Sequence, residues 1–178
     1  MTPPDESQGK CATERFNARL AALSDAERIA LLSTVCASPG WVHGLLAGAP
    51  FEDATALLAR ADRVLAALPD DEIDAALEGH PRIGDRPDNA ASAREQSAVA
   101  GADAEMKTRL TDGNRCYEQR FGHVYLVCAS GRSAEELLAI LTDRLGNDAE
   151  TERRIVRTEL GEINRLRLQR LLSGAEDP

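Results

Sequence analysis

Three helix-start motifs of one kind constrain the fold of this chain more than any other feature. Residues 24–27, 92–95 and 133–136 each read Ser-x-x-Glu. In such a capping box, the serine and glutamate side chains bind backbone N–H groups that the first turn of a helix leaves without partners. Residues 38–39, Ser-Pro, are a fourth helix start, because proline is favoured at the first helical position. These signals predict a chain built mainly of helices.

The spacing of apolar residues supports the same fold class. They recur three and four positions apart along most of the chain, which is typical of one helix face. Helices are expected at 13–23, 24–35, 39–46, 52–68, 70–78, 92–101, 103–121, 133–145 and 148–172. The run 123–129 is short, apolar and β-like, but no second clear strand exists to pair with it. We therefore expect an all-α fold, a single-domain compact helical bundle of about eight to nine helices, with a short extended segment near 123–129 and Trp41 as a core anchor.

Length and composition fit one globular domain. The chain has 178 residues, of which 43% are hydrophobic and 29% charged, enough for one sizeable core. We expect a disordered N-terminal tail at 1–9, one helical domain at 10–173 and a C-terminal tail at 174–178. A net charge of −9 argues against nucleic acid or an anionic membrane as a partner.

The same sequence features suggest a compartment. No run reaches the length of a membrane span, and the acidic start does not resemble a signal peptide. A cytoplasmic protein is therefore expected. The four cysteines are scattered without a close pair, so zinc has no support and free thiols are expected.

The stretch 77–97 joins two expected helices and carries the most suggestive chemistry. Gly79 can close the first helix. Pro81 then prevents the helix from continuing and favours an extended backbone at His80. The next helix start, at 92–96, carries a serine, a glutamate and a glutamine. An imidazole, a carboxylate and an amide are thus placed on two irregularly joined elements.

Each part of this stretch also has a structural interpretation. Taken alone, Ser92 and Glu95 form a helix cap, and a lone histidine in a loop is usually solvated. The functional interpretation rests on the combination of the three groups in a chain with only three histidines.

The order of two motifs supports a family assignment. Residues 80–84 (His-Pro-Arg-Ile-Gly) followed by 92–96 (Ser-Ala-Arg-Glu-Gln) resemble the signature of 2-oxo-4-hydroxy-4-carboxy-5-ureidoimidazoline (OHCU) decarboxylases. The pair is fairly specific, whereas either half alone is weak. The resemblance runs from about Phe16 to Leu172 and implies a carboxy-lyase that forms (S)-allantoin in the last step of urate degradation. It also implies a homodimer.

The resemblance implies roles for individual residues. His80 would be the general acid/base, because histidine exchanges protons near neutral pH. Glu95 would hold the imidazole tautomer or bind ureido N–H groups, and Arg167 would pair with an anionic part of the substrate. Arg167 lies on the apolar stripe of the last helix, where an arginine either reaches the surface or holds an anion. Arg165 is the alternative one register step away.

A second group of residues is expected to bind the substrate. These are Pro81, Ser92, Ala93, Arg94, Gln96, Tyr125, Leu126, Val127, Cys128 and Ala129. In the family, an aromatic run at the position of 125–129 lines the pocket with backbone groups. Here His123 and Val124 precede the run in place of an apolar residue and a proline. The N-terminus of the helix expected at Ser92 would add backbone N–H groups for an anion.

The implied substrate needs no cofactor. Its reacting carbon carries a hydroxyl and a carboxylate beside a C=N bond, which can accept the electron pair that remains when CO2 leaves. The sequence shows no site for pyridoxal phosphate, thiamine or metal.

Two alternatives remain open. A metal hydrolase is disfavoured because His43, His80 and His123 lack ligand spacing. A non-catalytic helical interaction module would leave His80 and Arg167 solvated and would make 92–95 only a cap. Convergence of His80, Glu95 and Arg167 on one pocket would separate the enzyme from the interaction module.

Overall fold

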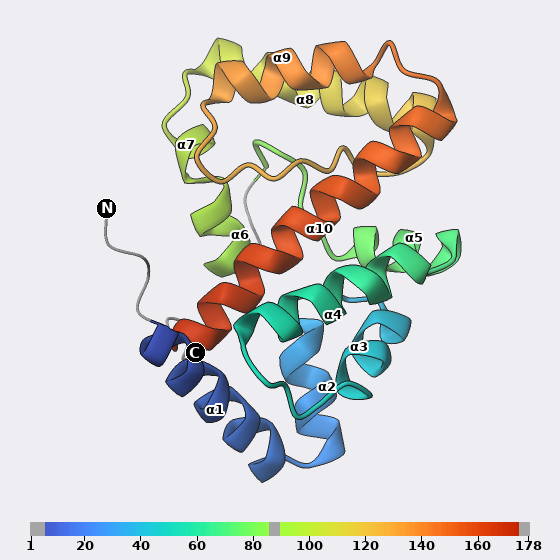
Figure 1. Ribbon diagram of the computed structural model, residues 1–178. Helices are drawn as coiled ribbons and strands as arrows, with labels where there is room; N and C mark the ends of the chain where they lie inside the picture. The colour runs from blue at the N-terminus through green and yellow to red at the C-terminus, as the bar shows by residue number, and fades with distance from the viewer. Residues whose placement is uncertain (1–5, 86–89, 175–178) are drawn as a thin grey trace. The chain divides into compact units, whose positions relative to one another are not determined.

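The computed structural model describes residues 6–85 and 90–174, which form ten α-helices and no strand (Figure 1). The expected all-α class is confirmed. The helices are α1 (Glu6–Ala22), α2 (Asp25–Ser33), α3 (Pro39–Leu46), α4 (Ala54–Ala67), α5 (Asp70–Glu78), α6 (Ala90–Glu95), α7 (Ser97–Ala100), α8 (Ala104–Phe121), α9 (Ala134–Arg144) and α10 (Ala149–Ser173). Two short helices, α6 and α7, stand where one was expected at 92–101.

The expected tails fall mostly outside the described residues. Residues 1–5 and 175–178 are not described. Residues 6–9, expected in the N-terminal tail, belong to α1. The described residues group into two compact units, one within Met1–Ile73 and Ile163–Pro178, the other within Asp74–Glu162.

The first unit has its core around α3. Helix α3 packs against α2 and α4, and α1 packs against α4. Trp41 is fully buried and its indole N–H donates to the Ala61 carbonyl at 3.3 Å, so the expected core anchor is confirmed. Gly44 allows α3 and α4 to approach closely, because an added Cβ there would lie 2.6 Å from a methyl carbon of Val64.

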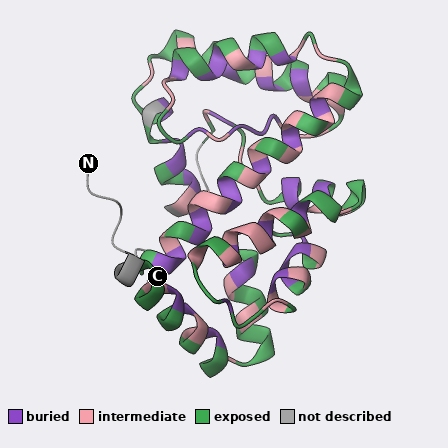
Figure 2. Cartoon of the chain, in the orientation of Figure 1, coloured by how far each residue is buried: buried purple, intermediate pink, exposed green. Residues whose placement is uncertain are grey.

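The second unit is organised by α8 and α9, which pack side by side (Figure 1). Helix α9 alternates buried and exposed residues at helical spacing (Figure 2). Its core contains Ile83, Val99, Leu110, Tyr117, Tyr125, Val127, Ala129, Ala134, Leu137, Leu138 and Leu141. The segment 124–129, which joins this core, is neither helix nor strand, as expected. The core therefore includes the segment that sequence reasoning assigned to the substrate pocket.

Three of the four predicted helix starts are confirmed. Ser24 and Ser133 form complete capping boxes with Glu27 and Glu136. Ser38 caps α3, with Pro39 as the first helical residue. The fourth prediction was wrong: α6 begins at Ala90, so Ser92 lies inside the helix and is not its cap. Alanine is the strongest helix former, and the alanines at 90 and 91 extend the helix upstream of the serine.

Helix α10 is the longest, at 25 residues, and its sequence is rich in charge. Its apolar stripe, on which Arg167 was expected, also carries Val156, Leu160 and Ile163, and all four residues are buried. In the described part of the chain, no helix combines the length and apolar character needed to cross a membrane.

Candidate active site

The end of α5 fixes the orientation of the His80 ring. The His80 backbone N–H donates to the Leu77 carbonyl at 3.0 Å, and the ring Nδ1 lies 2.9 Å from the Ala76 carbonyl oxygen. Because a carbonyl only accepts, Nδ1 must carry the proton of this hydrogen bond. In the neutral ring, Nε2 is then the nitrogen with a lone pair. The half-buried imidazole is thus set up as a base at Nε2.

The loop that follows His80 is held by side chains from later in the chain. The Gln96 amide oxygen accepts from the Gly84 N–H at 3.0 Å, and the Asn114 amide donates to the Ile83 carbonyl at 2.8 Å. Gly84 has φ +92°, a left-handed backbone that favours glycine. These contacts connect the His80 loop with the α6–α7 junction and with α8.

The residues of the motif 92–96 lie on two different faces of α6. Ser92, Glu95 and Gln96 are buried, at spacings of three and four residues that define one helix face. Ala93 and Arg94, also expected to bind substrate, are exposed. The buried face therefore carries a hydroxyl, a carboxylate and an amide, and Glu95 is only 8% exposed.

The negative charge of Glu95 acts on the segment 124–129 at Cys128. Burial raises the pKa of the Cys128 thiol, and the negative charges of Glu159 and Glu95 act in the same direction, against the Ser130 backbone and Arg132. Tyr125, Leu126, Val127 and Ala129 are buried, while Cys128 and Pro81 are half-buried. All the expected site residues except Arg167 belong to the second unit.

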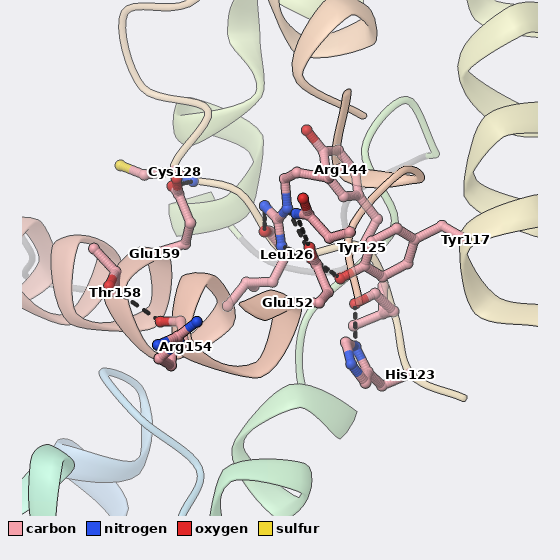
Figure 3. Close-up of polar contacts among 12 residues, drawn as sticks. Tyr117, His123, Tyr125, Leu126, Cys128, Arg144, Glu152, Arg154, Thr158 and Glu159 are labelled. Carbon is pink, nitrogen blue, oxygen red and sulfur yellow. Dashed lines mark hydrogen bonds and ion pairs between the residues drawn. The ribbon is translucent and has the colours of Figure 1, made fainter. Parts of the chain in front are cut away.

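A buried polar cluster supports this segment (Figure 3). Arg144 binds Glu152 through Nε at 2.8 Å and through Nη2 at 2.5 Å, and it donates through Nη1 to the Leu126 carbonyl at 2.7 Å. The Tyr117 hydroxyl also donates to Glu152. Burial pushes the pKa of Glu152 up, but the bonds from Arg144, Tyr117 and Asn147 outweigh it and hold that pKa below its usual range.

Arg167 belongs to the first unit. Its side chain is buried, at 7% exposure, and Nη1 donates to the Val35 carbonyl at 3.2 Å. Burial raises the pKa of the neighbouring Cys36 thiol, and the positive charge of Arg167 opposes that shift. Arg165, the register alternative, is 40% exposed in its side chain and pairs with Asp62. Of the two arginines, only Arg167 carries its charge into the interior.

Sequence reasoning missed the residues that orient the site. The Ala76 carbonyl holds His80, and Arg144, Glu152 and Glu159 support the segment 124–129. A signal for two of them was present: Arg144 continues the apolar stripe of α9, and Glu152 lies four residues before Val156 on the stripe of α10. A charged residue on an apolar stripe is the signal that indicated a role for Arg167. The same signal is present at Arg144 and at Glu152.

Comparisons with known proteins place the chain in one family. The family model of OHCU decarboxylase matches residues 21–169. The 2-oxo-4-hydroxy-4-carboxy-5-ureidoimidazoline decarboxylase of Amia calva is 30% identical over 132 residues, 70% of this chain and 75% of that protein. The uric acid degradation bifunctional protein TTL of Arabidopsis thaliana is 36% identical over 106 residues, 55% of this chain. This match spans only 33% of the Arabidopsis protein.

Solved structures agree at the level of the fold. A crystal structure of OHCU decarboxylase in the presence of (S)-allantoin has a TM-score of 0.72 at 25% identity, covering 79% of this chain and 96% of that one. A structure of (S)-allantoin synthase has a TM-score of 0.65 at 18% identity and covers 88% of this chain and 53% of that one. These matches define an all-α protein with the fold of the OHCU decarboxylases. The chain belongs to the OHCU decarboxylase family.

Proposed function

We propose that this protein decarboxylates 2-oxo-4-hydroxy-4-carboxy-5-ureidoimidazoline to (S)-allantoin. The observation that carries the proposal is the hydrogen bond between His80 Nδ1 and the Ala76 carbonyl. It fixes the tautomer that a general base needs, with the Nε2 lone pair as the proton acceptor. Family membership and the buried face of Ser92, Glu95 and Gln96 support the same reaction.

The substrate supplies its own electron sink. The bond between the ring carbon and the carboxylate breaks, and its electron pair moves into the adjacent C=N bond as CO2 leaves. A proton must then reach one face of the ring to give one enantiomer. The ring nitrogen that receives the electron pair takes one proton from solvent. His80 Nε2 takes the proton of the substrate hydroxyl, which becomes the carbonyl of the product, and returns it to the ring carbon that becomes the stereocentre, so the imidazole ends the cycle in the form in which it began.

The remaining site residues bind and orient the substrate. The Ala76 carbonyl already sets the His80 tautomer, so Glu95 is assigned to the ureido N–H groups. Ser92 and Gln96 offer donors and acceptors that match an amide-rich ring. Arg167 pairs with an anionic group of the substrate, for which an arginine is well suited.

The decisive experiment generates the unstable substrate in situ from urate and follows circular dichroism. Rapid appearance of one allantoin enantiomer, dependent on this protein, is the expected result. The same preparation after dialysis against chelator should retain its rate. Allantoin that forms only at the uncatalysed rate, as a racemate, would refute the proposal, and a rate restored only by added metal would refute its mechanism.

Two further proposals concern the oligomeric state, which the family resemblance supports, and the compartment, which rests on the sequence features described above. The protein forms a homodimer, which sedimentation or light scattering at micromolar concentration would measure. It resides in the cytoplasm, which imaging of a tagged full-length chain would test.

A further inference from the structure

Two helices hold one edge of the segment 124–129. Arg144 of α9 donates through Nη1 to the Leu126 carbonyl at 2.7 Å, and the Cys128 N–H donates to Glu159 Oε2 of α10 at 2.8 Å (Figure 3). In an extended chain, the backbone polar groups of residues i and i+2 point to the same edge. Leu126 and Cys128 therefore use one edge, and the N–H and carbonyl of Val127 point to the other.

The two anchoring side chains are themselves fixed. Glu152 binds Arg144, and it also accepts from Asn147 Nδ2 at 2.8 Å. The guanidinium of Arg144 lies over the Tyr125 ring, 4.9 Å from its centroid. Arg132 Nη1 lies 3.8 Å from Glu159 Oε2. Arg144 thus contacts the segment at two adjacent residues, at the ring of Tyr125 and at the carbonyl of Leu126.

Stability alone does not account for this arrangement. A buried ion pair loses hydration on both partners, and a well-packed apolar pair of similar volume often stabilises a protein as much or more. What the pair adds is direction, because a guanidinium offers several N–H groups in a rigid plane. Here that plane links Glu152 with the Leu126 carbonyl and fixes the rotation of the segment about its long axis.

We propose that Arg144 and Glu159 are positioning residues that hold the Leu126–Cys128 edge and so present the Val127 edge to the substrate. Neither side chain touches the substrate in this scheme. The proposal rests on the proposed function, in which this segment lines the pocket. The loss of either anchor lets the segment rotate, so the substrate binds less tightly while the chemistry at His80 is preserved.

The test compares Glu159→Ala with Glu159→Gln. Alanine removes the acceptor of the Cys128 N–H, whereas glutamine keeps an amide oxygen that can accept it. Arg144→Lys keeps the charge beside Glu152 but lacks the rigid planar set of donors. Glu162→Ala, an exposed glutamate on the same helix, is the matched control.

Two measurements are made on each variant: amide hydrogen exchange at 126–128, and kcat and KM in the in situ assay. We expect Glu159→Ala and Arg144→Lys to exchange faster at these amides. They should raise KM about tenfold to hundredfold, the effect of losing about one or two hydrogen bonds between the Val127 edge and the substrate. Their kcat should stay within about threefold of wild type, the pattern of lost uniform binding. Glu159→Gln and Glu162→Ala should behave like wild type in both measurements.

Three results would count against these ideas in different ways. Unchanged exchange and KM in folded Glu159→Ala and Arg144→Lys would overturn the positioning roles. Loss of kcat at unchanged KM would place the two residues in the chemistry instead. An inactive wild type would overturn the proposed function, while the exchange comparison would still decide whether the two residues hold the segment.

Discussion

His80 is held by the end of α5 in a way that an asparagine can imitate. The Asn side-chain amide has an N–H close to the position of Nδ1 and can donate to the Ala76 carbonyl, but it cannot exchange a proton near neutral pH. We expect the free energy of unfolding of His80→Asn to lie within about 0.5 kcal/mol of the wild-type value. Its turnover should fall about 10²- to 10⁴-fold. Residual product should drift toward the racemate. Thermal melts, turnover and optical rotation check this, and near-normal turnover would remove His80 as the proton-transfer group.

Glu95 is not the partner of a serine cap, because Ser92 lies inside α6. The interpretation of Ser92 and Glu95 as a capping box is therefore wrong. Glu95→Gln should keep the melting temperature within a few degrees and reduce turnover at least about tenfold, because a neutral amide binds ureido N–H groups less strongly than a carboxylate. A variant that is well folded and fully active would show that Glu95 contributes no charge to the reaction.

At the scale of helices, Gly113 lets α8 and α9 pack closely. A Cβ at Gly113 would lie 2.6 Å from the Cδ2 atom of Leu141, which is fully buried. Gly113→Ala gains about 1 kcal/mol in helix propensity but overfills the contact at a cost of about 1–3 kcal/mol. We expect a net loss of stability in denaturant titration. The control Gly9→Ala in α1, where nothing lies within 4 Å, should be neutral or stabilising.

A second helix contact gives a pH dependence. Hydrogen bonds from the Ser38 hydroxyl (2.6 Å) and the Gly40 N–H (3.0 Å) hold the pKa of Glu72 below its usual range. A depressed pKa in the folded state means that this stabilisation is present above the unfolded pKa and is lost as pH falls through the folded one. Glu72→Gln keeps an acceptor without a charge, so it should be about 1 kcal/mol less stable at pH 7. The difference from wild type should shrink as pH falls from about 5 to about 3. Melts across this range measure it, and a constant difference would contradict it.

The helices were predictable because their signals are local. Capping serines and apolar spacing depend on neighbours within one or two turns, and Ser24, Ser38 and Ser133 all cap as expected. The predicted start of α6 at Ser92 was wrong because the alanines before Ser92 are strong helix formers and outweighed the capping pattern. The contacts that shape the site are distant in sequence, such as Gly84 with Gln96 and Ile83 with Asn114. No periodicity encodes such pairs, so they appear only in the folded chain.

For the whole molecule, the expected single domain at 10–173 makes a calorimetric prediction. The boundaries between the two compact units fall inside α5 and α10, and separate unfolding would break both helices. We expect one transition with equal calorimetric and van't Hoff enthalpies, the mark of two-state unfolding. Scanning calorimetry together with far-UV circular dichroism measures both. Two resolved transitions would mean that the units unfold independently.

The bond between His80 and the Ala76 carbonyl has a consequence for charge. Ala76 lies in the last turn of α5, where carbonyls without helical partners form the negative pole of the helix dipole. When Nε2 takes up a proton, the resulting cation lies at that pole, an arrangement worth about 0.3–1 kcal/mol at an exposed helix end. In the proposed reaction, the C-terminal end of α5 would stabilise the protonated imidazole of His80. This stabilisation comes from backbone carbonyls, so no carboxylate of the site is needed to supply it.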